Sequence, residues 1–456
     1  MLFNTLDYLL VFLPIVYIIY LLLINQKNKS YLIIFFILCS IVFYSFWNIS
    51  LTYVILISVL INYFLLKNLI KFKSKTILFV GIAFNTFYLI YYKYTDYILN
   101  TLFNFKIINT QINYDVALPL AISFFTFQQI SFFIDSNKVK YKNLSLKKYI
   151  LHVIFFPQLI AGPIVKIDEL YLKLNNLYVS NKLIIYKNLF YGFSLISIGL
   201  FKKIIIAEYF TNITFEFASI QPKDISSLET LLFAFAYSLE IYFDFSAYCD
   251  MALGSAKIFN IHLPINFNSP YKSKNFIEFW QRWHITLSRF INEYIFRNIY
   301  KITRKLSNIS IAISLPIIIS FFISGLWHGA GNNFILWGLL HGLIVIFNQF
   351  NKKFKIISIS SNFLSISVTF LLVSILWIPF RISNIDYVFY LFKNIFNFNL
   401  SEFYFDNYQI IIGGLNYGNI FYYLLGFIIV FILPNIYQVI DQLEKAEKTK
   451  KFIIYK

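Results

Sequence analysis

Three histidines are the side chains of this sequence best suited to acid–base chemistry, and His328 has the most suggestive setting. It lies in ISFFISGLWHGAGNNFILWGLLHGL, between an apolar run and the break Gly329–Ala330–Gly331. A neutral imidazole can remove a proton from an attacking hydroxyl near pH 7. At membrane depth an imidazole is costly unless it faces a partner or a watery cavity. We therefore interpret His328 as a base at the mouth of a cavity or, alternatively, as a packing histidine bonded to a carbonyl. His341, in LWGLLHG, either orients His328 or has a structural role.

The segment 268–305 holds His284 and reads NSPYKSKNFIEFWQRWHITLSRFINEYIFRNIYKITRK. Charged residues interrupt it, so it is not a membrane span. Apolar residues recur at spacings of three and four, which predicts one amphipathic helix that lies at the interface or packs on the bundle. The stripe comprises Phe276, Phe279, Trp283, Leu287 and Phe290. Alternatively, the helix lies at the cytoplasmic face with its charges solvated.

Three acidic residues, Glu240, Asp244 and Asp250, interrupt the apolar run LLFAFAYSLEIYFDFSAYCDMALG. Glu240 and Asp244 are four apart and therefore share one helical face. Such groups face the interior of a bundle or a watery path. They either pair with Arg282, Arg289 or Lys202, or take part in catalysis. No phosphate-binding loop, dinucleotide fingerprint, HExxH or GxSxG motif is present, and Cys39 and Cys249 alone make a thiolate metal site or disulfide framework improbable.

The elements that must position these residues are membrane helices. Hydrophobic residues make up 59% of the 456 residues and charged residues only 13%, whereas soluble domains are nearer half apolar and a quarter charged. A span needs about 20 apolar residues. We expect roughly a dozen spans, all α-helical. They are 8–25, 31–47, 51–66, 76–93, 116–135, 149–163, 184–201, 204–220, 228–250, 308–327, 333–350, 362–380 and 418–438.

Lysines and arginines give the expected orientation. The net charge of +18 comes mainly from short connections between apolar runs, which indicates membrane topology and contact with anionic lipid headgroups in preference to nucleic acid. Alternate connections are basic, so we expect the N-terminus outside and those loops in the cytoplasm. The basic connections include Lys27, Lys29, Lys67, Lys71, Lys73, Lys75, Lys138, Lys140, Lys142, Lys147, Lys148, Lys202 and Lys203. Lys166 and Lys173 do not fit this alternation of basic connections.

We expect one membrane domain over 1–456, with N-terminal spans in 1–115, core motifs in 116–350, and C-terminal spans with a basic tail in 351–456. The N-terminus lacks a basic start and a cleavage site, so we take it as a retained first span. A transporter would share the many spans and intramembrane charges, but we find no inverted repeat. A scaffold that recruits an extracytoplasmic transferase is a second alternative.

Several blocks together resemble the membrane-bound O-acyltransferase family. Within it the chain looks most like the bacterial branch of alginate and peptidoglycan O-acetylation proteins, related to the D-alanyl transfer protein of teichoic acid synthesis. The blocks occur in order over nearly the whole chain. They are YSFWN (44–48), LPLAISFFTFQQISFFID (118–135), FFPQLIAGPIV (155–165), GLFKKIIIAEYF (199–210), YFDFSAYCDMALGSAKIFNIHLPINFNSPY (242–271), NFIEFWQRWHITLSRFINEYIF (275–296) and SGLWHGAGNNFILWGLLHG (324–342).

The resemblance implies a ring of tilted helices around a thin centre. On that analogy His328 in GLWHGA corresponds to the catalytic histidine and His284 in RWHITLS to the second motif histidine. We further expect substrate binding or support of the site from His341, Trp327, Trp283, Arg282, Asn332 and Asp244.

The resemblance also implies the reaction. Acetyl-CoA is the expected acyl donor at the cytoplasmic side of the bacterial inner membrane, with no bound cofactor or metal. The acetyl group is expected to reach an extracytoplasmic polysaccharide, with peptidoglycan favoured, through a periplasmic O-acetyltransferase partner. Alginate-type acetylation and D-alanyl transfer from an acyl carrier protein to teichoic acid are the alternatives.

Overall fold

The fold consists of helices, mostly α-helices, without strands in the residues that the computed structural model describes. These are residues 1–456 except 27, 29, 112–115, 137–143, 172–173, 175–181, 220–224, 398–416 and 455–456. The chain divides into two compact units. Unit 1 contains Met1–Ile196 and Tyr248–Ile265, and unit 2 contains Ser197–Ala247 and Asn266–Lys456. Two of the three divisions fall inside long helices, α10 (Lys182–Leu200) and α12 (Ser227–Ile258), and the third lies between Ile265 and Asn266.

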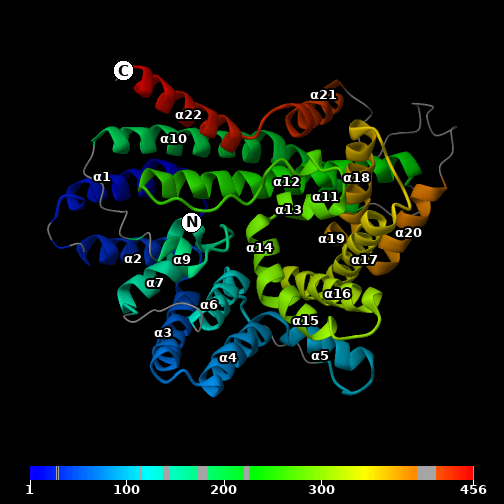
Figure 1. Cartoon of the computed structure of the whole chain (residues 1–456), viewed down its shortest axis with the longest axis horizontal. Helices are drawn as coiled ribbons and strands as arrows, with labels where there is room; N and C mark the ends of the chain where they lie inside the picture. Colours follow the sequence, from blue (N-terminus) through cyan, green and yellow to red (C-terminus); the bar gives the residue numbers. More distant parts are fainter. Residues whose placement is uncertain are drawn as a thin grey trace. The chain divides into compact units, whose positions relative to one another are not determined.

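Unit 1 is built from short and long helices that surround an apolar core. Besides parts of α10 and α12, its elements are the π-helix η1 (Asp7–Phe12), α1 (Leu13–Leu23), α2 (Ser30–Ser45), α3 (Ile49–Phe72), α4 (Lys75–Lys93), α5 (Thr95–Asn104), α6 (Ile122–Ser136), α7 (Leu146–Ile154), α8 (Phe156–Leu159) and α9 (Ile167–Leu170). Helices α3, α4 and α6 lie side by side (Figure 1).

Polar side chains join the helices of unit 1. Asn62 of α3 and Asn85 of α4 exchange amide hydrogen bonds of 3.2 and 2.6 Å. Gln129 of α6 donates to Ser58 at 3.0 Å and accepts from Tyr149 of α7 at 3.2 Å. All five side chains are buried. Such bonds hold helices together where apolar burial gives no preference for protein over lipid.

Unit 2 contains the residues that the sequence predicts to take part in catalysis or to support it. Its elements are η3 (Phe201–Ala207), α11 (Glu208–Ala218), η5 (Pro270–Lys272), α13 (Phe276–Arg282), α14 (Ile285–Phe290), η6 (Ile291–Phe296), α15 (Arg297–Thr303), α16 (Ile309–His328), α17 (Asn332–Phe354), α18 (Asn362–Leu376), α19 (Ile378–Arg381), α20 (Ile385–Phe396), α21 (Tyr417–Phe427), η9 (Ile428–Ile432) and α22 (Ile436–Ile454).

Six helices in the described part of the chain are long and apolar enough to cross a membrane, fewer than the dozen expected. They are Ile49–Phe72, Lys75–Lys93, Leu183–Ala218, Ile309–His328, Asn332–Phe354 and Asn362–Arg381, and a pair bent by 46°, Ile420–Ile432 with Ile436–Leu443, adds a seventh if it is one span. The expected spans 184–201 and 204–220 form one continuous helix. The expected spans 116–135 and 149–163 are short helices instead, α6 and the pair α7–α8.

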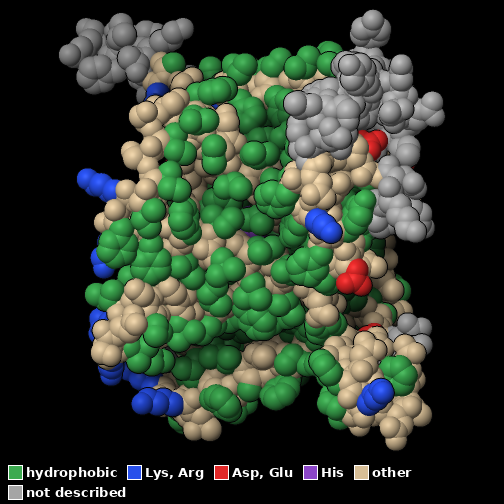
Figure 2. Space-filling model, turned by 90° about the vertical axis from the view of Figure 1, so that its right-hand side faces the viewer, with side chains coloured by type: hydrophobic (Ala, Val, Ile, Leu, Met, Phe, Trp, Pro, Cys, Tyr) green, Lys and Arg blue, Asp and Glu red, His purple; other side chains and the backbone are tan. Residues whose placement is uncertain are grey.

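Hydrophobic side chains predominate on the face shown in Figure 2, and charged side chains are sparse there. Large apolar residues on the spans are strongly exposed, for example Phe79 at 72% and Phe363 at 79%. This surface suits lipid, because exposing so much apolar area to water is unfavourable. Of the lysines behind the expected orientation, Lys27, Lys29, Lys138, Lys140, Lys142 and Lys173 lie outside the described residues.

Pro316 lies inside α16 and leaves one carbonyl of that helix without its usual partner. A proline has no amide hydrogen to give to the carbonyl four residues before it, which here belongs to Ala312. The hydroxyl of Thr303, at the end of α15, donates to that carbonyl at 2.8 Å. A side chain thus restores the backbone hydrogen bond that lipid cannot supply, and α15 is held against α16.

Helices α16 and α17 form an antiparallel hairpin whose close contact depends on glycine (Figure 1). A Cβ atom on Gly325 would lie 2.3 Å from the carbonyl oxygen of Phe334, and one on Gly338 would lie 2.3 Å from that of Phe321. Both neighbours are backbone atoms, so no side chain can yield. Small residues are the usual means by which membrane helices approach so closely.

We expect Gly338→Ala to push α17 away from α16, because the added methyl meets a carbonyl oxygen. The free energy of unfolding in detergent should fall by about 1–3 kcal/mol, the usual cost of overpacking. Gly342→Ala is the matched control, since its Cβ would meet only the Phe321 and Ile318 side chains, at 3.1 and 3.3 Å. Equal stability of the two variants in thermal unfolding would contradict the proposed contact.

Candidate active site

His328 is the last residue of α16 and lies within a group of aromatic rings. Its ring centroid is 4.7 Å from Trp327, 5.0 Å from Trp337 and 4.9 Å from Phe380, all in edge-to-face geometry. The next residue, Gly329, has no room for a side chain, because a Cβ would lie 2.1 Å from the ring of Phe334. The glycine after the helix thus lets the chain turn immediately and leaves His328 at the helix end, partly exposed.

His341 lies on α17 and is fully buried between aromatic rings. Its centroid is 5.0 Å from Trp337, 5.2 Å from Trp280 and 5.6 Å from Trp377. Among the described residues, neither of its ring nitrogens has a hydrogen-bond partner. The ring of Trp337 contacts both His328 and His341. His341 therefore does not orient His328 through a direct hydrogen bond, and the two rings are linked through an indole.

His284 interrupts the helix that the sequence predicts over 276–290. The stripe residues Phe276, Phe279, Trp283, Leu287 and Phe290 are all buried, as amphipathic packing requires. The single continuous helix was wrong, however. The chain leaves helical geometry at Trp283 and His284, and His284 adopts φ 41° and ψ 55° before α14 begins. This left-handed conformation is uncommon for a residue other than glycine and indicates local strain.

Asn266 holds this break from a distant point in the sequence. Its side-chain oxygen accepts from the Thr286 amide at 3.2 Å, from the Thr286 hydroxyl at 2.7 Å and from His284 Nδ1 at 3.3 Å. Its backbone carbonyl accepts from the Ile285 amide at 2.9 Å. The proton of His284 is thus placed on Nδ1, because an amide oxygen only accepts.

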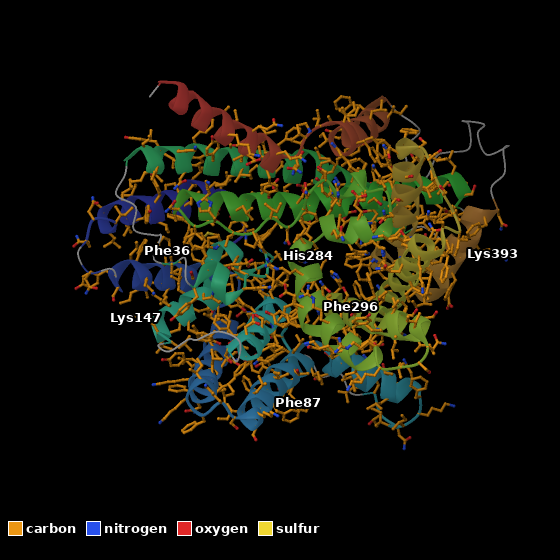
Figure 3. The ribbon with its side chains drawn as sticks, viewed as in Figure 1. Phe36, Phe87, Lys147, His284, Phe296 and Lys393 are labelled. Carbon is orange, nitrogen blue, oxygen red and sulfur yellow. The ribbon has the colours of Figure 1, made fainter. Side chains whose placement is uncertain are left out.

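The other ring nitrogen of His284, Nε2, is buried without a hydrogen-bond partner in the described part of the chain. Burial lowers the pKa of His284 to about 3, so the ring is neutral near pH 7. His284 is only 1% exposed and lies inside unit 2 at the start of α14 (Figure 3). Its ring is 5.8 Å from Trp327, which in turn contacts His328. One indole therefore bridges the two motif histidines.

The remaining predicted residues divide between this cluster and its surroundings. Trp327 and Trp283 are buried within it, Trp283 against Trp377 at 5.0 Å. Asn332 starts α17 and is exposed, whereas its neighbour Asn333 is buried and donates to the Pro379 carbonyl at 3.0 Å.

The ion-pair partners predicted for Glu240 and Asp244 were partly wrong. Asp244 pairs with Lys203, and Arg282 pairs with Glu278 at 2.7 Å, one helical turn away. Glu240 accepts a hydrogen bond from the Thr214 hydroxyl. Lys203 lies in the π-helical segment η3, whose wider turn the sequence pattern does not announce. No group of three histidine, cysteine or acidic side chains suited to a metal ion occurs within the described ranges.

A cavity of about 710 Å³ lies in unit 2 between α13, α14, η6, α15, α16 and α17. That volume is within the usual range for a small-molecule site. Its walls are mainly apolar, with polar side chains at intervals. Trp280, whose ring contacts both Trp337 and His341, forms part of the wall. The cavity and the histidine cluster therefore share a side chain.

Sequence reasoning missed several residues of this arrangement. Trp280 and Trp337 stand in the quoted motifs. Trp337 lies four residues before His341 on α17, the helical spacing that could have marked it. Trp280 lies four residues before His284, but the chain leaves helical geometry between them. Asn266 carries no such signal, because its partners lie 18 and 20 positions away.

Asn266→Ala should destabilise the start of α14, because it leaves buried donors of Thr286 and His284 without an acceptor. Each such loss costs about 1–3 kcal/mol, so we expect a clear drop in the thermal unfolding temperature in detergent. Asn298→Ala is the control, since that exposed side chain makes one local bond to Tyr294. An unfolding temperature of the Asn266 variant equal to that of the control would refute this role.

Comparisons with known proteins identify the family and several relatives of this chain. Residues 36–355 match the membrane-bound O-acyltransferase family. The chain is 35% identical over 428 residues to the peptidoglycan O-acetyltransferase of Helicobacter pylori, which covers 85% of this chain and 78% of that protein. It is 28% identical over 418 residues to a probable alginate O-acetylase of Pseudomonas aeruginosa, in an alignment that covers 87% of this chain and 75% of that protein. It is 31% identical over 245 residues to the teichoic acid D-alanyltransferase of Bacillus subtilis, in an alignment that covers 52% of this chain and 61% of that protein.

The family match extends over well more than half of the chain and includes the α16–α17 hairpin with His328 and His341. Together with the all-helical, lipid-facing fold, it identifies the chain as a member of the membrane-bound O-acyltransferase family and hence as an O-acyltransferase.

Proposed function

We propose that this enzyme moves acetyl groups from cytoplasmic acetyl-CoA across the inner membrane for O-acetylation of peptidoglycan, which a periplasmic partner completes. The support for peptidoglycan is the likeness to the acetyltransferase of Helicobacter pylori, which extends over most of both chains. The likeness to the D-alanyltransferase covers about half of this chain, so acetyl transfer is the better supported reaction.

The observation that carries the proposal is the difference in exposure between the three histidines of the site, His284, His328 and His341. His284 and His341 are buried at 1% and 0% exposure, whereas His328 is partly exposed at the end of its helix. A base must come within hydrogen-bond reach of the proton it removes. His328 therefore has the access that an acceptor hydroxyl requires, and the other two histidines support it from within the protein.

In the proposed reaction, the imidazole of His328 takes up a proton and then gives it to the leaving group. The acceptor hydroxyl attacks the thioester carbonyl as its proton passes to the imidazole. The carbon–sulfur bond then breaks, and the sulfur leaves as a thiol once it takes up that proton. The products are the acetyl ester and free coenzyme A. A transient acetyl-imidazole on His328 would give the same products in two transfers, the imidazole acting as nucleophile.

The donor is proposed to approach through the cavity of unit 2. Arg289 contributes positive charge to its wall, and the part of the basic segment 257–306 that belongs to unit 2 holds further lysines and arginines. Positive charge attracts the phosphates of coenzyme A before the arm enters. Membrane lipid surrounds the enzyme, and the acetylated product passes to the external partner.

His328→Ala should abolish acetyl transfer from radiolabelled acetyl-CoA by the purified protein, with a loss of at least about 100-fold, as expected for a general base. His262→Ala is the matched control, because that exposed histidine lies in unit 1. Both variants should unfold at the temperature of the parent protein. Full transfer by a folded His328→Ala protein would exclude His328 as base or carrier. Peptidoglycan acetate measured in a deletion strain tests the acceptor separately.

A further inference from the structure

Three aromatic rings surround the imidazole of His328. The ring centroids of Trp327, Trp337 and Phe380 lie 4.7, 5.0 and 4.9 Å from that of His328, at interplanar angles of 81°, 84° and 73°. All three arrangements are near perpendicular, so none of these rings stacks on the imidazole. An aromatic ring is negative on its faces and positive at its edge. A perpendicular arrangement therefore lets the edge of the imidazole, where its N–H and C–H groups lie, meet the negative face of a neighbouring ring.

The proposed reaction places a positive charge on His328. As a base the imidazole becomes an imidazolium. As a nucleophile it becomes an acetyl-imidazolium, whose other nitrogen keeps its proton until the departing thiolate takes it up. Trp327 and Trp337 are buried, and His328 and Phe380 are only partly exposed, so little water reaches that charge. A charge taken out of water is costly unless a partner stabilises it.

The elements that supply these rings offer no carboxylate as that partner. Helices α16, α17 and α19 contain no acidic residue. Their support for a cation must therefore come from the backbone and from the aromatic faces. His328 is the last of the 20 residues of α16, and the C-terminal end of a helix carries a partial negative charge that favours a cationic histidine in the last turn.

Phe380 is held in place from α17. It lies on the four-residue helix α19, and Asn333 donates a hydrogen bond to the carbonyl of its neighbour Pro379 at 3.0 Å. Asn333 is buried, so this bond is sheltered from water. The ring of Trp337 lies 5.2 Å from that of Phe380. The backbone and the side chain of Phe380 are thus both fixed beside His328.

We propose that the aromatic faces around His328, that of Phe380 in particular, stabilise the positive charge that this histidine acquires during acyl transfer, together with the end of α16. The centroid distances lie within the roughly 6 Å over which a cation and an aromatic face attract each other. Because the attraction arises only once the imidazole is charged, it lowers the barrier of the reaction and leaves substrate binding unchanged. Phe380 acts through His328 and is therefore a positioning residue. This inference rests on the role of His328 in the proposed function.

Fluorination of the Phe380 ring tests the inference, because each fluorine weakens the negative potential of the ring face with little change in ring size. Full-length proteins carry mono-, di- or trifluorinated phenylalanine at this position, introduced by nonsense suppression. The ring of Phe380 is preferred to those of Trp327 and Trp337, since these also contact His284 and His341.

The same three fluorinated residues at Phe370 are the matched control. Phe370 is buried on α18, and its ring lies 5.0 Å from that of Tyr271 and 5.5 Å from that of Phe235. Its ring neighbours in the described part of the chain include no histidine. This series therefore reports what fluorine does to aromatic packing alone.

With acetyl-CoA as donor, kcat should fall stepwise with the number of fluorines at Phe380, by about 3- to 30-fold for the trifluorinated ring, while KM stays within about twofold. The series at Phe370 should match the parent protein. Equal losses at both positions would show a general effect on packing and would overturn the proposal. So would an unchanged kcat, or a kcat that rises with added fluorines, because a rise would place the ring edge against the charge.

A second donor separates this inference from the proposed function. The Phe380 series is also measured with a D-alanyl carrier protein. A stepwise fall seen only with that donor would uphold the inference and refute acetyl transfer. Acetyl transfer that depends on His328 but is insensitive to fluorine at Phe380 would refute the inference alone. Transfer that survives in the His328→Ala protein would refute both.

Discussion

The close contact between α16 and α17 is the constraint on which the site depends. Backbone meets backbone at Gly325 and Gly338, and membrane helices gain their association from such packing because lipid offers the same apolar environment as protein. The contact sets His328 at the end of one helix and His341 on the other, with the ring of Trp337 between them. A wider separation of the helices would leave Trp337 without one of its two histidine neighbours.

Side chains satisfy several buried polar groups of the scaffold. Thr303 pairs with the carbonyl that Pro316 frees, and Asn62 pairs with Asn85. Around the site, in the residues described, both nitrogens of His341 and the indole N–H of Trp280 have no partner. Buried groups without a partner cost stability, so the histidine cluster is not optimised for stability alone.

Local sequence patterns predicted the parts of this arrangement that depend on neighbours in the chain. The apolar run before Gly329 placed His328 at a helix end, and the three–four spacing identified the stripe that packs inward. The break at His284 could not be predicted, because the propensities of residues 276–290 favour one helix and the acceptor that stabilises the break is Asn266, on a segment before α13. The pairing of Asp244 with Lys203 was missed for a similar reason, since the π-helical turn of η3 changes which residue faces α12.

The unequal burial of the histidines gives each a different chemical capacity. His284 donates from Nδ1 to Asn266, and its low pKa keeps the ring neutral. It therefore packs against Trp327 as a fixed, uncharged ring. His341 is enclosed by aromatic rings and has no path for an acceptor hydroxyl. His328 alone combines ring contacts that fix its orientation with partial exposure. Fixed geometry and access are both needed for proton removal, and within this cluster only His328 has both.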